Sequence, residues 1–444
     1  MTRTHLHPGL AVLAGAILAA LPVAAAAAPH RAADGTEQQV NRTTEGDQYF
    51  PAAATNRHGL RLVVWTDTSQ LASHHHDHAD DHDHGTGHDH GEEPTGQTRV
   101  VARLLDQAGR PFGDEIPLDE GTPGNQQYPA VTALDDGSFV VAWLRSAGPS
   151  ANQVRTVRLG REGRLGTATT VSQHATPVQF APAISSLPGN RYVVAWTGAG
   201  SDSPSAWDAK ARVMDLRRPR TDEFTLNRTT ADKQSRPALA RTAGGFVAAW
   251  TDASGLSVGQ GTGVRGALLD AKGRFATPER QLDEAAPGNQ GRPSLAVGRD
   301  QGIAVAWEDV TSPGRDGSGG AAVVRLFDRR LACAGPERVL SSITTGNQQK
   351  PRLTALPRGG YVAVWEDGSR SADDPVHLAV CSRELSARGL PLGRDRLVNL
   401  STQDNQQQPL VTAGQRGGVL AVWTDESHAG PDTEATRVVA RRLA

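Results

Sequence analysis

One unit is written seven times along this sequence, and the repeat constrains the fold more than any other feature. Each unit contains Gln, two variable residues and Pro, followed by an apolar run that ends in Trp. The Gln/Pro pairs are Gln48/Pro51, Gln126/Pro129, Gln179/Pro182, Gln234/Pro237, Gln290/Pro293, Gln348/Pro351 and Gln406/Pro409. The runs end at Trp65, Trp143, Trp196, Trp250, Trp307, Trp365 and Trp423. A fixed period of this kind indicates a repeat architecture.

Each unit predicts four short strands. The stretch after Pro, such as 130–134, is a first strand, and a Gly-containing turn leads to the run that ends in Trp. These runs do not alternate apolar and polar residues, which indicates a strand that is covered on both faces. A third strand such as 99–105 and a fourth such as 115–118 complete the unit. Four strands per unit of roughly 50 to 60 residues suit a propeller blade.

The two ends of the chain complement each other. The last unit stops after its third strand, and residues 37–41 match 394–399, which lie where a fourth strand is expected. An N-terminal strand that completes the last blade would remove an exposed edge. The sequence therefore predicts an all-β fold, a seven-bladed β-propeller of four-stranded blades over 37–444, closed by the N-terminal strand.

The repeat resembles the Gln-x-x-Pro…Gly-Gly-Phe-Val-Val-x-Trp units of large secreted bacterial repeat proteins. The resemblance covers nearly the whole chain and is clear at 244–250, which read Gly-Gly-Phe-Val-Ala-Ala-Trp. Proteins with similar repeats mostly lack an assigned activity, so the resemblance implies a fold rather than a function.

Residues 1–26 have the features of a secretory signal peptide. Arg3 precedes an apolar run at 10–23, and an alanine run follows. We expect a disordered N-terminus at 27–36, export to the periplasm or the medium, and no membrane span after signal removal. A formal net charge of −2 argues against nucleic acid as a partner. Cys333 and Cys381 lie in consecutive units, and the sequence leaves open whether they form a disulfide or stay free thiols.

A segment rich in His and Asp, residues 72–96, is inserted after the second strand of the first unit, and we expect it to be a disordered loop. Its candidate metal ligands are His74, His75, His76, His78, His82, His84, His88, His90, Asp77, Asp81, Asp83 and Asp89. Imidazole and carboxylate groups together suit Zn²⁺, Ni²⁺ or Cu²⁺. The segment resembles the His/Asp-rich loops of exported zinc-uptake proteins. The alternative is a solvated acidic linker without a metal role.

The Gln of each unit is expected near the axis of the ring, where the chain enters each blade. Gln48, Gln126, Gln290, Gln348 and Gln406 are therefore candidate ligand contacts at the mouth of a central channel. The alternative is structural, since a Gln side chain can bond backbone groups that are left free where two blades meet.

The position two residues after Gln differs from unit to unit. It reads Phe50, Tyr128, Ala181, Arg236, Arg292, Lys350 and Gln408. If these side chains reach the channel, two aromatic rings form a stacking wall and three cations form a basic wall. Such a site would suit an anionic sugar or acidic glycan. The alternative is a set of solvated rim side chains.

A carboxylate follows most of the Trp strands. Asp67, Asp252, Asp309, Asp367 and Asp425 lie two residues after Trp, and Glu308 and Glu366 precede two of them. Together with 316–318 and 373–374, these oxygens are candidate ligands for Ca²⁺. The alternative is that Asp starts local turns.

No sequence motif defines a catalytic nucleophile or a phosphate-binding loop, so the sequence does not favour an enzyme. The first hypothesis is an exported binding or scaffold module that recognises a glycan or a protein on its top face. A second is a periplasmic protein that binds or buffers divalent metals through its His-rich segment. A third is a propeller enzyme that acts on extracellular polysaccharide.

Overall fold

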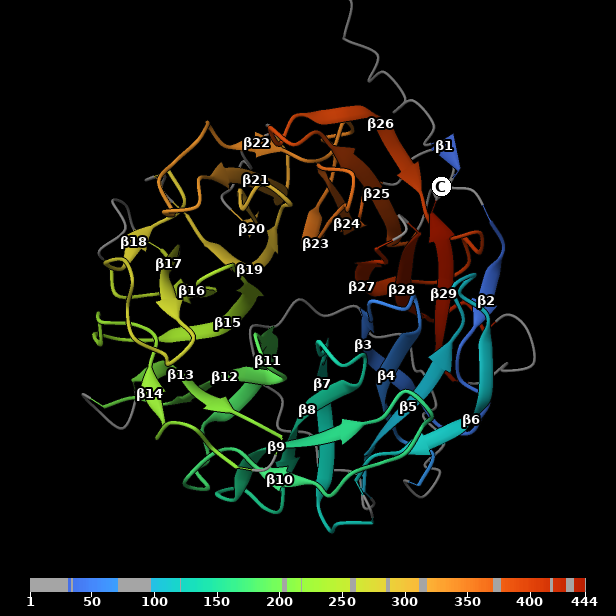
Figure 1. Ribbon diagram of the computed structural model, residues 1–444. Coiled ribbons are helices and arrows are strands. Elements are labelled where there is room, and N and C mark those ends of the chain that lie inside the picture. The colour runs from blue at the N-terminus through green and yellow to red at the C-terminus, as the bar shows by residue number, and fades with distance from the viewer. Residues whose placement is uncertain are drawn as a thin grey trace, which may run out of the picture.

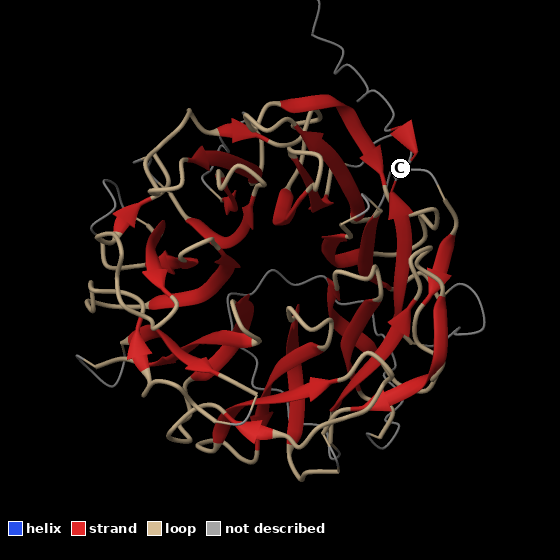
Figure 2. Cartoon of the chain, viewed as in Figure 1, coloured by secondary structure: helices blue, strands red, loops and turns tan. Residues whose placement is uncertain are grey.

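The seven repeats form seven four-stranded antiparallel sheets arranged in a ring (Figure 1). The computed structural model describes residues 31–32, 35–70, 97–119, 121–201, 206–216, 218–255, 261–284, 288–310, 318–369, 377–415, 418–428 and 435–443. Within these ranges the chain consists of strands and loops and has no helix (Figure 2), hence none that could cross a membrane. The predicted all-β, seven-bladed β-propeller is confirmed.

The first six blades each use four strands in chain order. Blades 1 to 3 consist of β3 (Gln48–Thr55), β4 (Arg61–Asp67), β5 (Arg99–Leu105) and β6 (Pro111–Pro117); β7 (Asn125–Ala133), β8 (Phe139–Ser146), β9 (Asn152–Leu159) and β10 (Thr169–Thr170); and β11 (Gln179–Leu187), β12 (Arg191–Ala199), β13 (Trp207–Met214) and β14 (Phe224–Thr225). Blades 4 to 6 consist of β15 (Gln234–Arg241), β16 (Gly245–Asp252), β17 (Gly263–Asp270) and β18 (Arg280–Gln281); β19 (Gln290–Val297), β20 (Ile303–Asp309), β21 (Ala321–Phe327) and β22 (Arg338–Val339); and β23 (Gln348–Ala355), β24 (Tyr361–Asp367), β25 (Ala379–Leu385) and β26 (Pro391–Leu397).

Blade 7 is built from both ends of the chain. It contains β27 (Gln406–Ala413), β28 (Val419–Asp425), β29 (Arg437–Leu443) and the N-terminal β2 (Glu37–Gln39). Strand β2 pairs antiparallel with β29, with Glu37 opposite Arg441 and Gln39 opposite Val439. The predicted closure is therefore confirmed. A two-residue strand, β1 (Arg31–Ala32), adds to β26 in parallel, within a segment for which the sequence indicated no strand.

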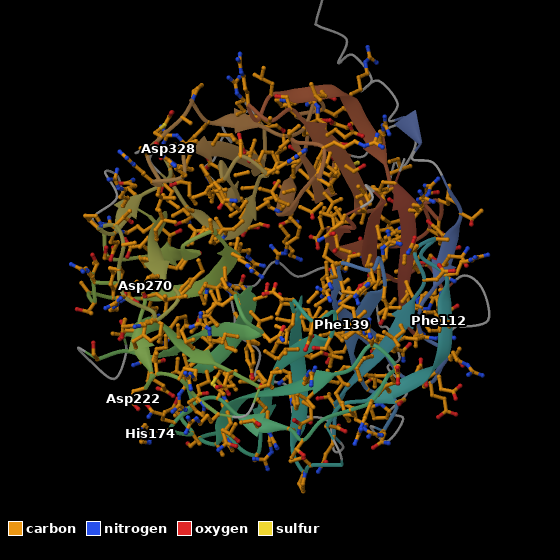
Figure 3. All side chains as sticks on the ribbon, in the orientation of Figure 1. Phe112, Phe139, His174, Asp222, Asp270 and Asp328 are labelled. Atoms are coloured by element: carbon orange, nitrogen blue, oxygen red, sulfur yellow. The ribbon has the colours of Figure 1, made fainter. Side chains whose placement is uncertain are left out.

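The hydrophobic core lies between neighbouring blades. All seven repeat Trp side chains are at most 1% exposed. One cluster joins Val247 and Ala249 of blade 4 to Val305 and Trp307 of blade 5, and the other junctions are packed in the same way. This packing explains why the second strands are apolar on both faces. Figure 3 shows the contrast between Phe139, which is buried in blade 2, and Phe112, which lies on the outer rim.

The first strand of each blade is the innermost one. Strands β3, β7, β11, β15, β19, β23 and β27 contact one another in sequence around the axis (Figure 1). Side chains that leave these strands toward the axis therefore come together from all seven blades.

Candidate functional site

Every innermost strand contains a β-bulge between the Gln and the Pro of the repeat. In β7 the pairing with β8 shifts between Gln127 and Ala130, and the other first strands shift at the equivalent residues. The residue before Pro has a left-handed backbone with φ between 50° and 56°, yet none of the seven is Gly. These residues are Phe50, Tyr128, Ala181, Arg236, Arg292, Lys350 and Gln408. A bulge bends the strand and redirects a side chain, and Pro suits it because Pro donates no ladder hydrogen bond.

The bulges are held by the preceding blade. In five blades the backbone N–H of the bulge residue donates to the side chain that follows the Trp of that blade. The pairs are Tyr128 N to Thr66 Oγ1 (3.3 Å), Arg236 N to Thr197 Oγ1 (2.9 Å), Arg292 N to Thr251 Oγ1 (3.0 Å), Lys350 N to Glu308 Oε2 (3.2 Å) and Gln408 N to Glu366 Oε1 (2.7 Å). At the closing junction, Gln408 Oε1 accepts from both Phe50 N (2.6 Å) and Thr424 Oγ1 (3.1 Å). Six of the seven bulges are therefore held by a side chain from outside their own blade.

The seven bulge residues, and six of the seven prolines that follow them, line one cavity of about 450 Å³. Because all seven blades contribute, this cavity lies on the axis of the ring. The structure thus brings together Phe50, Tyr128, Arg236, Arg292 and Lys350, the five residues that the sequence singled out at this position.

One side of the cavity is aromatic. The rings of Phe50 and Tyr128 lie 4.6 Å apart, and Tyr49 packs edge-on against Phe50 at 4.8 Å. Tyr128 is 36% exposed and so is available to a ligand. Phe180 of blade 3 also lines the cavity, and its ring contacts Trp207 edge-on at 5.1 Å. The aromatic side therefore spans blades 1 to 3.

The opposite side is cationic. Arg236, Arg292 and Lys350 come from blades 4 to 6, and Arg352, one residue beyond Pro351, joins them. Enclosure by the blades lowers the pKa of Arg236, and the neighbouring Arg292 lowers it further. The same two causes lower the pKa of Arg352, although its side chain faces the open cavity. Sequence reasoning missed Arg352, although the position after Pro is Ala in blades 1 to 4 and Ser in blade 5.

The Gln side chains do not face this cavity. All seven are at most 4% exposed, and they hydrogen-bond within the blades. Gln126 Oε1 accepts from Trp143 Nε1 at 2.7 Å, and Gln406 Oε1 from Trp423 Nε1 at 2.8 Å. This placement contradicts the expectation that Gln48, Gln126, Gln290, Gln348 and Gln406 contact a ligand, and it supports the structural alternative.

The aspartates that follow the Trp strands are buried as well. Asp252, Asp309 and Asp425 accept from the Nε2 of the Gln in the same blade at 2.8 to 3.2 Å, and Asp425 also pairs with Arg437 at 2.6 Å. Burial raises the pKa of Asp67. In the described ranges no group of three or more His, Cys, Asp or Glu could hold a metal ion. Nothing in the placement of these aspartates therefore favours a Ca²⁺ site.

Two further expectations concern metals and thiols. The His/Asp-rich segment and residues 316–317 and 373–374 lie outside the described residues, so metal binding there stays a prediction. Cys333 is exposed, and its Sγ donates to the carbonyl oxygen of Gly335 at 3.0 Å. Cys381 is buried in β25, and no disulfide joins these two described cysteines.

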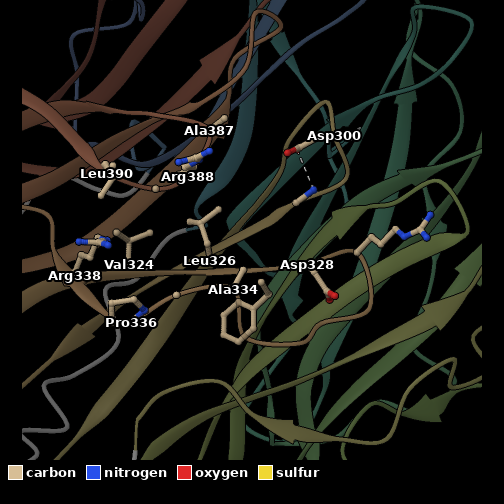
Figure 4. Close-up of a pocket in the computed structure, with 15 residues that line it drawn as sticks. Asp300, Val324, Leu326, Asp328, Ala334, Pro336, Arg338, Ala387, Arg388 and Leu390 are labelled. Carbon is tan, nitrogen blue, oxygen red and sulfur yellow. Dashed lines mark hydrogen bonds between the residues drawn. The ribbon is translucent and has the colours of Figure 1, made fainter.

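A second cavity, of about 660 Å³, lies at the periphery between blades 5 and 6 (Figure 4). It is lined by Val324 and Leu326 of β21 and by Leu390 before β26. The carboxylates of Asp300 and Asp328 at its edge accept hydrogen bonds within their own turns. Because its walls come from two blades only and its acids serve local turns, the axial cavity is the stronger candidate site.

No model of a known protein family and no curated protein matches the sequence. Several solved structures share the fold. A family GH93 α-L-arabinofuranosidase of Fusarium graminearum, in complex with arabinobiose, is 11% identical with a TM-score of 0.51. An α-L-arabinanase of Penicillium chrysogenum, also complexed with arabinobiose, is 12% identical with a TM-score of 0.51. A protein of unknown function from Dyadobacter fermentans is 10% identical with a TM-score of 0.50. Each comparison covers 92% of this chain and 97% of the other.

Similarity at this level of identity defines the fold alone. The chain is a seven-bladed β-propeller in which an axial cavity carries aromatic side chains on one side and cations on the other.

Proposed function

We propose that this protein is an exported, polysaccharide-directed propeller that binds a carbohydrate chain in its axial cavity. The observation that carries the proposal is the ring of seven bulges. Each bulge has a residue other than Gly in a left-handed backbone conformation beside the cavity.

The backbone conformation argues that these side chains have a use. A left-handed conformation costs an L-residue about 1–2 kcal/mol, and Gly adopts it without that penalty. A ring selected for folding alone would therefore favour Gly at these positions. Strained residues that the surrounding structure holds in place are typical of functional sites.

The lining of the cavity suits a sugar. Its volume of about 450 Å³ lies within the range of small-molecule sites, which are mostly apolar with a few polar groups that fix orientation. The rings of Phe50 and Tyr128 offer flat apolar surface, and the cations across the cavity offer hydrogen-bond donors. The arabinobiose complexes of the similar arabinofuranosidase and arabinanase support the proposal, because they show that this fold can carry a carbohydrate site.

Binding of the full chain to arrayed glycans tests the proposal. Tyr128→Gly removes an aromatic ring but suits the left-handed backbone, so we expect binding to fall at least tenfold while thermal stability is kept or increased. Phe112→Ala is the matched control, because Phe112 is 45% exposed on the outer rim, away from the cavity. Equal loss of binding in both variants, or no loss in Tyr128→Gly, would contradict the proposal.

A second candidate function is cleavage of the bound polysaccharide, since the two carbohydrate-bound proteins of similar fold are enzymes. Hydrolysis commonly uses two carboxylates on either side of the scissile bond. Glu308 and Glu366 are the carboxylates paired with the basic side, and each accepts from one cation and one bulge N–H. Release of new reducing ends from a bound glycan would support this candidate. Stable binding without product would exclude it for that glycan.

A further inference from the structure

The four cations of the basic side fall into two classes. Arg292 Nε lies 2.8 Å from Glu308 Oε1, and Lys350 Nζ lies 3.0 Å from Glu366 Oε1. These two pairs are electrically neutral. In the described part of the chain, by contrast, no carboxylate lies within ion-pair distance of Arg236 or Arg352.

The paired carboxylates also have a structural task. Glu308 and Glu366 occupy the position directly after Trp, which is Thr in blades 1, 3, 4 and 7. Like the threonines of blades 1, 3 and 4, they accept the N–H of the next bulge residue. Each Glu thus adds an ion pair to an interaction that Thr provides elsewhere. Substitution of Glu308 or Glu366 by Thr should therefore remove the ion pair and preserve the bulge.

Arg236 and Arg352 remain as the uncompensated charges of the cavity. They come from blades 4 and 6, on either side of Arg292, and both line the same space. Each is close enough to Arg292 for repulsion to lower its pKa, and Arg236 also acts on Arg352. Both guanidinium groups are exposed in the open cavity, where the repulsion between neighbouring like charges is unfavourable. A bound anion would relieve this cost for both guanidinium groups.

Arg352 departs from the repeat where the cavity is formed. The other six blades have Ala52, Ala130, Ala183, Ala238, Ser294 and Leu410 at this position. Folding therefore does not require Arg there, because small residues occupy this position in five successive blades. Among the described residues, its side chain donates one hydrogen bond, from Nη1 to the carbonyl oxygen of Pro351 at 3.2 Å, which leaves most of its five donors available to a ligand.

We infer that Arg236 and Arg352 form a clamp for the anionic group of an acidic sugar, a carboxylate or a sulfate, and that they select acidic over neutral carbohydrate. This inference rests on the proposed function and names its substrate class. The planar guanidinium group presents paired donors that match such oxyanions. Arg292 and Lys350 contribute less to the selection, because Glu308 and Glu366 already neutralise them.

The test uses the full chain and arrayed glycans in matched pairs, with and without one carboxylate or one sulfate. We expect the acidic member to bind about 10- to 100-fold more tightly. Arg352→Ala has its precedent in blades 1 to 4, and Arg236→Ala has its precedent in Ala181, so both should fold. Each should remove most of the preference and leave the neutral member's binding within a few-fold. The member that is preferred, carboxylated or sulfated, identifies the group.

The matched control is Arg274→Ala, which removes the cation of an ion pair with Asp270 on the exposed surface, away from the cavity. We expect the acid preference to survive in it. Loss of preference in this control but not in Arg352→Ala would overturn the inference. If the wild type binds the acidic and neutral members equally, and Tyr128→Gly still loses binding, the inference is overturned but the proposed function is not. Absence of any glycan binding would overturn the proposed function as well.

Discussion

Asn41 Oδ1 accepts a hydrogen bond from the backbone N–H of Val438 at 2.9 Å, and this contact joins the two ends of the chain. Asn227 makes the equivalent contact with Ala209 N, and Asn399 with Val380 N, each within one continuous blade. The closing blade therefore reproduces the contact of an ordinary blade across a separation of 397 residues.

We expect Asn41→Ala to destabilise the closed ring. Asn41 is buried, and its Nδ2 also donates to Gln48 Oε1 and to the carbonyl oxygen of Thr43, both at 2.8 Å. Loss of these partners should lower the free energy of unfolding by about 1–3 kcal/mol. Urea unfolding measures the change. Gln38→Ala is the control, because that side chain bonds only Thr36 at the surface; a similar loss in the control would contradict the role of Asn41 in closure.

The contact between Gln126 and Trp143 predicts a purely structural phenotype. Gln126→Ala leaves the buried Trp143 N–H without its acceptor, so we expect a loss of about 1–3 kcal/mol in unfolding free energy and unchanged glycan affinity. In the background of Trp143→Phe, which has no N–H to satisfy, the same substitution should cost less. A double-mutant cycle measures this coupling. Additive effects would show that the hydrogen bond does not stabilise the blade.

The β-bulge explains which parts of the site could be predicted from the sequence. The repeat defines equivalent positions, so the blades, the ring closure and the seven bulge residues that line the cavity followed from its period. The direction in which the Gln side chains point could not be predicted from that period. In a regular strand, Gln48 and Phe50 would share a face because side chains alternate with a period of two. The bulge breaks this alternation, so Gln48 enters the blade while Phe50 lines the cavity.

Two other features needed the structure for a different reason. Arg352 was visible as a departure from the Ala found in four other units, but nothing in the sequence showed that this position faces the axis. Strand β1 has only two residues, which is too short for a detectable hydrophobic pattern. The ion pairs of Glu308 and Glu366 form within blades 5 and 6, between neighbouring strands, and the repeat alone does not show which side chains meet there.

Two Ala→Gly substitutions in β11 test the left-handed bulge directly. Ala181 has φ of 50°, so Ala181→Gly should relieve strain and raise the thermal midpoint. Ala183 pairs regularly with Ala195 in the same strand, so Ala183→Gly should lose about 0.5–1 kcal/mol. Calorimetry of both variants gives the comparison. Equal destabilisation by the two substitutions would contradict a strained bulge.

Burial of Asp67 predicts a dependence of stability on pH. Because burial raises the pKa of Asp67, the folded protein holds a proton there more tightly than the unfolded chain. The stability that this group contributes is therefore lost as the pH rises from about 3.9, its pKa in the unfolded chain, through its higher pKa in the folded protein. Asp67→Asn keeps an acceptor for the N–H of Ser69 and carries no charge. The variant should be more stable than the wild type at pH 7 and equal to it below about pH 4.

Asp135 provides the opposite case for that experiment. A hydrogen bond from Arg241 lowers the pKa of Asp135, so its contribution is present at neutral pH and is lost as the pH falls. Asp135→Asn should therefore reduce stability at pH 7 and lose this effect in acid. Urea unfolding across pH 3.5 to 7, on the order of six points, separates the two signs. Parallel pH profiles for the two variants would contradict both assignments.

Removal of the His/Asp-rich segment predicts loss of metal binding without loss of the fold. Strands β4 and β5 pair on either side of it, with Asp67 opposite Arg99, so a short linker can replace residues 72–96. We expect calorimetry to detect Zn²⁺ binding to the wild type and none to the deletion variant, with similar thermal midpoints for both. Binding should weaken below about pH 6.5, because protonated imidazole does not bind metal. Zn²⁺ affinity that survives the deletion would place the metal site elsewhere, and glycan binding that survives it would separate the two properties.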